Sequence, residues 1–408
     1  MVELTNKGLP HFQETGLRDV LESVTLTRKT FRAYERFEGF SCQTYIITVG
    51  TPLDHEGNAR LDMIRSATTE VAGHMSDDAL VILRSTVKIG TARDVVRPIL
   101  TATGKRFKLA MCPERTLEGA ALRELRELPQ IIGADTQEER TAAAELFKTL
   151  TNKTVEVTSL EAAEIIKLVD NTSRDIRFAF ANEVARLCEA FSVNAHEVIA
   201  SGKLGYPRTE VALPGLVGGP CLEKDPHILA QSAATKGIDL EITRAARLVN
   251  ERQPVETVGF LASLLTAHNV SPDAPITLLG LAFKGVPETD DLRGSMALKV
   301  LRALQAARPE APITLYDPVI EARDLAAVDP GCHVATSLEA ALKGARLVVI
   351  SNNHSSFGQK ALEFYFKHAH PEAWLYDYWS HFSHYSPPER YPRYLSLGHV
   401  AHAQGAHI

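Results

Sequence analysis

The chain alternates short runs of consecutive apolar residues with longer segments that have helical spacing. In the first third, residues 45–49, 79–83 and 107–111 are almost wholly apolar. Such runs, separated by helix-length segments, are typical of buried strands in a parallel sheet with crossover helices. Residues 276–280, 313–317 and 346–350 repeat the pattern, with a helix predicted at residues 296–301. We therefore expect two α/β domains.

Between these domains, residues 159–193 keep near-helical apolar spacing with almost no helix breakers. Ser159 is placed to cap a helix, with Glu161 and Glu164 in its first turns, where carboxylates favour the helix dipole. We expect one long central helix, which is either a dimer seam or a core helix of a monomer. The predicted domains are residues 1–155, 156–260 and 261–385, followed by a tail at residues 386–408.

Composition excludes several classes of protein. With 408 residues and a net charge of −6, the chain offers no overall basic field that would attract nucleic acid or an anionic membrane. It has no apolar run long enough to span a bilayer, and its N-terminus does not resemble a signal peptide. We therefore expect no nucleic-acid and no membrane partner.

The cysteines and histidines point to neither disulfides nor a metal site. The five cysteines are odd in number and widely spaced, which argues against a disulfide framework and favours a reducing cytoplasm. The 15 histidines form no metal-ligand pattern. Those between His381 and His407 are interpreted as belonging to a solvated tail.

One stretch of the middle region carries the features of a nucleophile site. Cys221 follows Gly218, Gly219 and Pro220, and Lys224 and Asp225 come three and four residues later. Glycines before a thiol allow substrate to approach closely, and a nearby cation favours the reactive thiolate. The alternative is a buried structural cysteine beside a turn.

Polar residues elsewhere favour the nucleophile hypothesis. Lys167 and Asn171 stand four residues apart on the predicted central helix, hence on one face, with Arg174 near that face. An ammonium and a carboxamide pointing the same way can stabilise a developing oxyanion, although such a pair also occurs on solvated helix faces. Glu114, at the end of a predicted strand, is either a residue that positions a general-base water or an ordinary loop carboxylate.

Together these pieces resemble the UDP-glucose/GDP-mannose dehydrogenase family over residues 8–382. The matching segments occur in the family's order along the chain: residues 49–52, 85–91, 112–115, 163–171, 180–183, 218–225, 280–295 and 316–318. The resemblance implies two Rossmann-like parallel-sheet domains joined by a helical central domain, NAD as cofactor, a UDP-sugar as substrate, and a homodimer formed through the central helix.

The resemblance also implies a four-electron oxidation. The C6 alcohol of the sugar loses a hydride to give an aldehyde, which Cys221 traps as a thiohemiacetal. A second hydride transfer then gives a thioester, and water releases the uronate. The thiol is needed because an aldehyde cannot lose a second hydride until a nucleophile has added to it.

By position in the matched motifs, Lys167 and Asn171 would steady the oxyanion and Asp225 would assist proton movement. Glu114, with Thr86, would handle the hydrolytic water. The other residues implied to bind ligands are Thr51, Pro52, Thr86 and Lys284 for the cofactor, and Arg115, Arg174, Arg208, Gly218, Gly219, Phe283, Lys284 and Arg293 for the substrate.

The substrate branch is indicated by two segments. Cys112-Pro113-Glu114-Arg115, and the stretch from Asn171 to Glu183, resemble the branch that acts on UDP-N-acetylhexosamines. We therefore expect UDP-N-acetyl-mannosamine as the substrate, with UDP-N-acetylglucosamine as the next candidate.

The chain departs from the family pattern at its N-terminus. We expect the first α/β domain to be N-terminally truncated, because the glycine-rich GxGxxG unit that holds the NAD pyrophosphate is not found. Either the natural start lies upstream and the protein is a complete dehydrogenase, or the chain is short and is a UDP-sugar-binding protein that cannot hold NAD. A separate alternative is a thiol-based hydrolase or transferase that uses Cys221.

Overall fold

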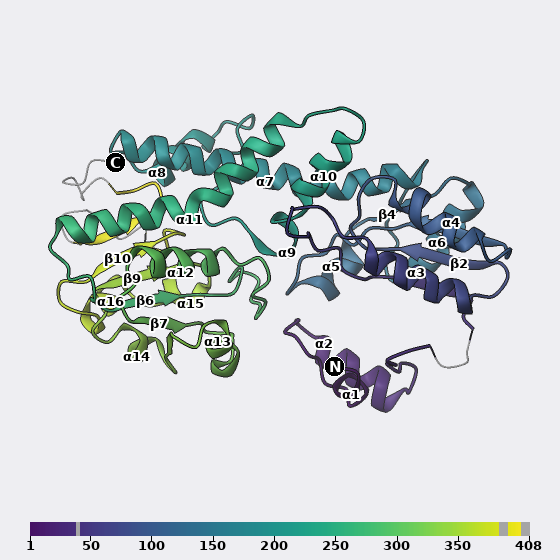
Figure 1. The fold of residues 1–408 in the computed structure, drawn as a ribbon, viewed down its shortest axis with the longest axis horizontal. Helices are drawn as coiled ribbons and strands as arrows, with labels where there is room; N and C mark the ends of the chain where they lie inside the picture. The colour runs from purple at the N-terminus through teal and green to yellow at the C-terminus, as the bar shows by residue number, and fades with distance from the viewer. Residues whose placement is uncertain (38–40, 383–390, 401–408) are drawn as a thin grey trace. The chain divides into compact units, whose positions relative to one another are not determined.

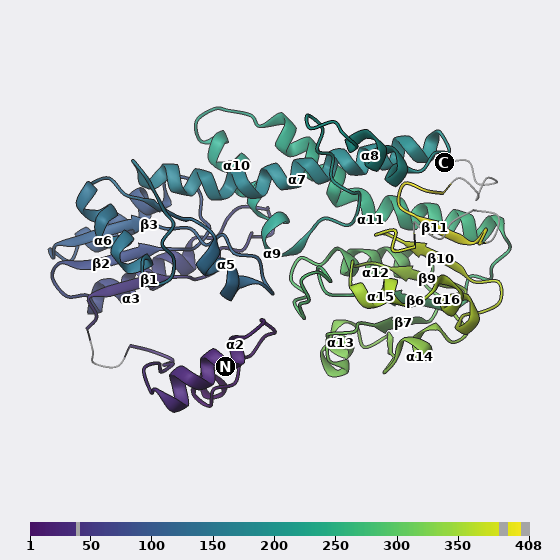
Figure 2. The same ribbon diagram turned by 180° about the vertical axis from the view of Figure 1, so that it is seen from behind.

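The computed structural model describes residues 1–37, 41–382 and 391–400. The chain divides into two compact units (Figures 1 and 2). The first consists of Met1–Ser173 and Lys224–Glu241, and the second of Arg174–Glu223 and Ile242–Ile408. Each unit is built around one β-sheet.

The sheet of the first unit has the strand order β1-β2-β3-β4-β5. Its neighbouring strands are parallel except for β3 and β4, which meet at a single antiparallel pair, Met111 and Gly133. Two strands, β2 and β3, have the predicted bounds. The five strands are β1 (Thr44–Ile47), β2 (Ala79–Leu83), β3 (Phe107–Met111), β4 (Gln130–Gly133) and β5 (Thr154–Val157).

Helices cover both faces of this sheet, which explains why its central strands β2 and β3 are almost wholly apolar. Val81 and Leu83 of β2 belong to the core beneath α3, η2 and α4, whereas Leu80 and Ile82 belong to the core beneath α6. The helical elements of the unit are α1 (Val2–Asn6), α2 (Leu17–Glu22), η1 (Ser23–Thr27), α3 (Asp62–His74), η2 (Ala92–Val96), α4 (Arg97–Thr101), α5 (Ala121–Glu127), α6 (Gln137–Phe147) and α10 (Asp225–Ala234).

The sheet of the second unit is parallel and has the order β11-β10-β9-β6-β7-β8. Counted along the chain this is 3-2-1-4-5-6, the doubly wound arrangement in which ligands bind where the strand order reverses. That point lies between β6 and β9. The strands are β6 (Ile276–Leu279), β7 (Ile313–Tyr316), β8 (His333–Val334), β9 (Leu347–Ile350), β10 (Trp374–Asp377) and β11 (Tyr394–Ser396).

Two apolar cores again enclose this sheet. Leu347 and Val349 of β9 face a core that includes α12, while Val348 and Ile350 face one that includes α14 and α16. The helices of the unit besides α7 are α8 (Ala195–Lys203), α9 (Gly219–Leu222), α11 (Glu241–Ala267), α12 (Met296–Ala307), α13 (Ala322–Val328), α14 (Leu338–Leu342), α15 (Ser355–Gln359) and α16 (Leu362–His368).

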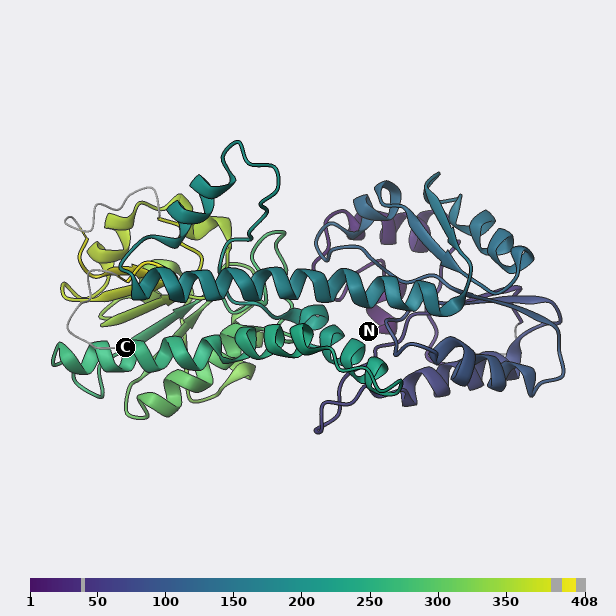
Figure 3. The same cartoon turned by 90° about the horizontal axis from the view of Figure 1, so that it is seen from above.

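The predicted long helix is α7 (Leu160–Ala190), and the Ala162 N–H of its first turn donates a 3.1 Å hydrogen bond to the Ser159 hydroxyl. A second long helix, α11, was not predicted and contains Pro254. In the second unit, the two helices lie side by side (Figure 3), and Ala179 of α7 packs with Ala246 and Val249 of α11.

The prediction of a solvated tail is wrong for residues 391–400. The strand β11 adds in parallel to β10, and all three of its residues are buried. Residues 386–390 and 401–408 of the predicted tail, including His402 and His407, lie outside the described residues, as does His384. None of the helices in the described part of the chain has the length and apolar character that a bilayer-spanning segment needs.

Candidate active site

The carboxyl ends of three parallel strands meet at one edge of the first sheet. Ile47, Leu83 and Met111 end β1, β2 and β3 and stand in register across them. The loops that follow are therefore neighbours, and the Thr51 hydroxyl donates a 2.5 Å hydrogen bond to the carbonyl of Thr86. A Cβ at Gly50 would meet no atom within 4 Å, so this edge has open space.

Loops at the carboxyl ends of parallel strands are where α/β domains bind dinucleotides. Thr51, Pro52 and Thr86 lie on these loops, so their placement fits a bound NAD. Thr51 is buried, and Pro52 and Thr86 are half-buried. The remaining predicted cofactor residue, Lys284, belongs to the second unit.

Glu114 is held on both of its carboxylate oxygens. Oε1 accepts hydrogen bonds from the backbone N–H groups of Arg115 (2.7 Å) and Thr116 (2.9 Å), and Oε2 pairs with the guanidinium of Arg84. Burial raises the pKa of Glu114, but the charge and hydrogen bond of Arg84 and these two N–H groups outweigh it, so the net pKa is lowered. The carboxyl group is therefore an anion at neutral pH.

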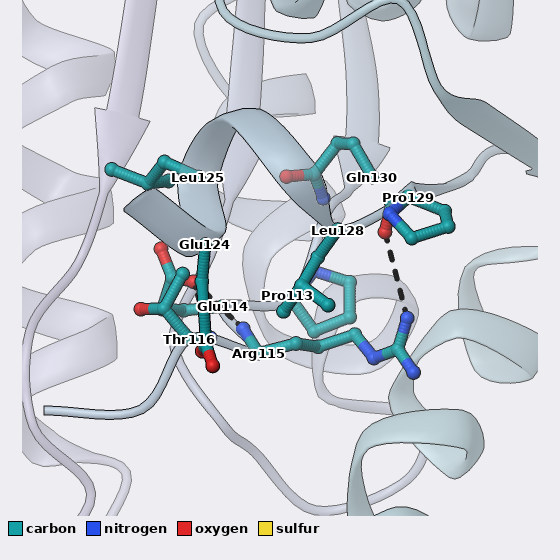
Figure 4. Close-up of a pocket in the computed structure, with 9 residues that line it drawn as sticks. All are labelled: Pro113, Glu114, Arg115, Thr116, Glu124, Leu125, Leu128, Pro129 and Gln130. Carbon is teal, nitrogen blue, oxygen red and sulfur yellow. Dashed lines mark hydrogen bonds between the residues drawn. The ribbon is translucent and has the colours of Figure 1, made fainter. Parts of the chain in front are cut away.

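Arg115 points away from Glu114 and toward the central helix. Its guanidinium forms an ion pair with Asp170 at 2.9 Å and donates to the carbonyl of Pro129 at 3.5 Å. Arg115 and Glu114 line a pocket together with Leu128 and Pro129 of the segment after α5 (Figure 4). The predicted substrate residue Arg115 is thus fixed by protein contacts at its tip.

Asn171 and Asp225 are joined in the buried interior, and Lys167, one turn before Asn171 on α7, is also buried. Asn171 donates from Nδ2 to Oδ2 of Asp225 at 2.6 Å, and Lys224 pairs with the other oxygen of Asp225 at 2.5 Å. Asp225 is fully buried, and Lys167 is only 8% exposed. Among the described residues, Lys167 makes no hydrogen bond or ion pair, so its ammonium remains available to a ligand.

Cys221 is exposed and lies in the short helix α9. Gly219, the first residue of α9, has a φ of 86°, which a residue with a side chain adopts only under strain. A Cβ there would lie 2.4 Å from the ring of Phe283, and one at Gly218 would lie 2.4 Å from the carbonyl oxygen of Gly294. Both glycines therefore allow the backbone before the thiol to approach the second sheet's loops closely.

The residues predicted to meet the nucleotide lie on these same loops. Phe283 follows β6, at the point where the strand order reverses, and the Lys284 ammonium lies 5.2 Å from the centre of its ring. Arg293 is exposed and forms a two-point ion pair with Asp291, with a shortest distance of 2.6 Å. The second unit thus brings Cys221, Gly218, Gly219, Phe283 and Arg293 onto adjoining segments.

Two predicted substrate residues stand apart from this group. Arg174 is exposed on α7, and Arg208 is exposed on the loop after α8, with its guanidinium 4.6 Å from the ring centre of Tyr206. Within the described chain, neither residue forms a hydrogen bond or ion pair with the other predicted substrate residues.

Two contacts that hold the predicted loops were not predicted from the sequence. Arg84, which holds Glu114, is 7% exposed and also donates to the side-chain oxygen of Gln130 at 2.9 Å. Glu164 is buried and accepts the N–H groups of Gly90 (2.6 Å) and Ala92 (2.8 Å), which ties the loop after Thr86 to α7. Burial raises the pKa of Glu164 to about 7. Neither contact has a signal in sequence spacing.

Comparison with known proteins identifies each segment. Three parts of the UDP-glucose/GDP-mannose dehydrogenase family match: its NAD-binding domain at residues 1–151, its central domain at 161–252 and its UDP-binding domain at 277–384. The expectation that the glycine-rich NAD-binding unit is missing is not supported, because the NAD-binding domain matches from residue 1.

Individual relatives agree with this assignment. A UDP-N-acetyl-D-mannosamine dehydrogenase of Pyrococcus horikoshii is 34% identical over 364 residues, covering 88% of this chain and 82% of the relative. One from Campylobacter jejuni is 32% identical and covers 88% of both chains.

A solved structure of the enzyme from Pyrococcus horikoshii superimposes with a TM-score of 0.86 at 30% identity, over 98% of this chain and 91% of that chain. With the family matched in three consecutive domains and the fold matched over nearly its whole length, this chain belongs to the UDP-glucose/GDP-mannose dehydrogenase family and contains its NAD-binding domain.

Proposed function

We propose that this chain oxidises the C6 alcohol of UDP-N-acetyl-mannosamine to a carboxylate, with NAD as the oxidant. The observation that carries the proposal is the placement of Cys221, exposed on a glycine turn that packs against Phe283 and Gly294 of the UDP-binding domain. A thiol beside a nucleotide-binding loop is positioned to react with the sugar that the nucleotide carries.

The reaction needs two oxidations at one carbon. Bound NAD+ supplies the chemistry of hydride acceptance, once in each half of the reaction. Overall, RCH2OH, two NAD+ and one H2O give RCOO−, two NADH and three H+. Between the two hydride transfers, the Cys221 sulfur adds to the aldehyde carbon and keeps the intermediate bound.

We propose that Lys167 and Asn171 stabilise the negative charge that develops on the oxygen of that carbon. The Lys167 ammonium is buried and available, and the Asn171 amide is oriented by Asp225. Buried donors that are already oriented stabilise a developing oxyanion more strongly than water does. Asp225 comes four positions after Cys221, so the Cα atoms of the two residues can lie at most roughly 14 Å apart.

Hydrolysis of the thioester requires a water and a proton acceptor. Glu114 and Thr86 lie on adjoining strand-end loops, and the ionised carboxylate of Glu114 can accept a proton from water. Asp225, whose two oxygens are bound by Lys224 and Asn171, assists proton movement in the same site.

The choice of sugar rests on relatives. UDP-N-acetyl-D-mannosamine dehydrogenases match this chain at 34% and 32% identity. The Arg115 ion pair with Asp170 joins the Cys112–Arg115 loop to α7, and we propose that this pair shapes the site for the N-acetyl group. A UDP-sugar-binding protein without activity is not favoured, because the matched relatives are dehydrogenases.

The test is NADH formation against UDP-N-acetyl-mannosamine, UDP-N-acetylglucosamine and UDP-glucose. We expect two NADH per molecule of UDP-N-acetyl-mannosamine and a lower kcat/KM for the other two sugars. The Cys221→Ser variant is expected to form no thioester and to release aldehyde slowly at most. Full conversion to the uronate by this variant would exclude Cys221 as the nucleophile, and a chain that binds the sugar without reducing NAD would defeat the proposal.

We further propose a homodimer formed through the central helices, in the cytoplasm, where the five unpaired cysteines would stay reduced. Phe180 and Leu187 of α7, and Phe191 just after it, are 54%, 57% and 72% exposed. Exposed apolar side chains gathered on one element mark interaction surfaces. The domain division at residues 1–155, 156–260 and 261–385 is part of the same proposal.

A further inference from the structure

The segment that carries the thiol depends on other elements for its shape. Residues 214–222, here named the cysteine segment, contain no helix or strand other than the four-residue helix α9. Buried backbone carbonyl groups need hydrogen-bond partners, and a segment without regular structure must find them elsewhere. Those partners determine where the sulfur of Cys221 lies.

Arg247 of α11 supplies two of these partners. Its Nη2 donates to the carbonyl of Val217 at 3.0 Å, and its Nη1 donates to the carbonyl of Leu222 at 2.7 Å. One carbonyl lies just before the glycine pair and the other lies immediately after Cys221. The planar guanidinium presents its donors at fixed angles, so it sets the spacing of both ends of the turn at once.

The charge of Arg247 is balanced by Asp175 of α7 and by Glu251 of α11, whose carboxylate lies 3.3 Å from Nε. Arg247 is 2% exposed, and its Nη1 also lies 2.7 Å from Oδ1 of the fully buried Asp175. Asn250, one turn later on α11, donates to the same oxygen of Asp175 at 2.9 Å. Arg247 is thus held by two backbone carbonyls and by the carboxylates of Asp175 and Glu251, so it has little freedom to move.

Asn182 fixes the beginning of the cysteine segment. It accepts a hydrogen bond from the Gly215 N–H at 3.0 Å and donates to the Gly215 carbonyl at 3.1 Å. Its Nδ2 also donates to Asn250 at 3.0 Å, so the amide belongs to the same buried network. The segment is thus held at Gly215, Val217 and Leu222 from the side of α7 and α11.

We propose that Arg247 is a positioning residue, which fixes Cys221 for attack on the sugar aldehyde by holding the carbonyls of Val217 and Leu222. The inference rests on the proposed function and adds to it a residue that touches neither the substrate nor the reacting atoms. Lysine at this position would keep the charge beside Asp175 but lose the planar fork. A thiol displaced by about 1 Å can cost a reaction on the order of 100-fold in rate.

The test compares Arg247→Lys with Arg252→Lys, a control on the same helix whose exposed ion pair with Glu256 lies away from this network. For Arg247→Lys we expect kcat to fall about 10-fold or more while KM for the UDP-sugar changes little. We also expect fewer than two NADH per sugar consumed, because aldehyde that the thiol fails to trap leaves the site. Arg252→Lys should match the wild type in kcat, in KM and in the number of NADH formed per sugar.

A second readout does not require turnover. The alkylation rate of Cys221 by iodoacetamide, followed by mass spectrometry of its peptide, should differ about threefold or more between Arg247→Lys and the wild type. If Arg247→Lys does not fold, Asn182→Ser, which removes the hydrogen bonds of Asn182 to Gly215 and Asn250, takes its place with changes in the same direction. Folded variants with unchanged NADH stoichiometry, kcat and alkylation rate would overturn the inference.

The two failures are distinguishable. A wild-type chain that forms no NADH with any UDP-sugar would defeat the proposed function. The alkylation rates would still report whether Arg247 determines the position of the thiol.

Discussion

The side chain of Asn171 donates a 2.6 Å hydrogen bond to the buried carboxylate of Asp225, whose other oxygen is paired with Lys224. The carboxylate therefore determines which way the amide of Asn171 faces. For Asp225→Asn we predict a fall in kcat of about 100-fold, the magnitude typical of losing one oriented oxyanion donor. Steady-state kinetics measure this, with the exposed Asp62→Asn as control, and equal losses in both variants would contradict it.

Lys167 is predicted to act in turnover more than in binding. It is buried and makes no hydrogen bond or ion pair among the described residues, so its removal should cost stabilisation that appears only in the transition state. For Lys167→Ala we expect kcat to fall by about 100-fold with little change in KM. The matched control is Lys148→Ala, a surface lysine paired with Glu145. An unchanged kcat in Lys167→Ala would make Lys167 a structural residue.

Glu164 should make stability depend on pH. Burial raises its folded pKa to about 7 from an ordinary value of 4.5, so the folded protein holds this proton more tightly than the unfolded chain. Its contribution is complete below about pH 4.5 and is lost as the pH rises through 7, with a slope of at most about 1.4 kcal/mol per pH unit. Between pH 5 and 8, the wild type should therefore lose stability relative to Glu164→Gln as the pH rises.

Denaturant unfolding at several pH values measures this difference. Glu161→Gln is the control, because the hydrogen bond from Arg93 lowers the pKa of Glu161, and its difference from the wild type should stay flat over the same range. Glu189 is a second test of the same physics, since burial also raises its pKa to about 7. A flat difference for Glu164→Gln would contradict the prediction.

Arg84 is predicted to keep Glu114 ionised. Burial raises the pKa of Glu114, and the guanidinium of Arg84 opposes this effect. Without the guanidinium, the pKa of Glu114 should therefore rise. For Arg84→Met we expect the acidic limb of the pH profile of kcat to move to higher pH, because a base must be deprotonated to act. Arg84→Lys, which keeps the charge, should shift the limb less. If the acidic limb lies at the same pH in Arg84→Met and the wild type, ionisation of Glu114 does not control kcat.

The exposed apolar residues around the end of α7 predict self-association. Replacing Leu187 and Phe191 with aspartate should convert a dimer to a monomer, since charges on an apolar interface oppose its burial. Light scattering after size-exclusion chromatography gives the mass directly. Met63→Asp, a change at an exposed apolar residue of α3, should leave the mass unchanged. A wild-type monomer at micromolar concentration would contradict the dimer.

Continuous apolar runs predicted the central strands well. Strands β2 and β3 match the predicted residues, and β6, β7 and β9 differ by one residue at an end, because strands buried on both faces must be apolar throughout. The edge strand β11 was predicted as tail because its three residues form too short a run. The helix α11 was missed because Pro254 reads as a helix breaker.

Some residues of the candidate site could be predicted from the sequence, and others could not. Cys221, Lys167 and Asn171 could be proposed from residue type, spacing and family motifs. Arg84 and Arg247 could not, because each acts on a group 25 or more residues away, across a contact that exists only in the folded chain. Long-range hydrogen bonds leave no period and no spacing in a single sequence.

The bond from the Gly219 N–H to the Gly294 carbonyl, 2.7 Å long, has a consequence for substrate length. It joins the turn that carries the thiol to the loop that carries Arg293. The distance between the thiol and the residues proposed to bind the nucleotide is therefore fixed by the backbone. A sugar attached through a longer or shorter phosphate linkage would present the wrong atom to sulfur, however well its uridine was bound.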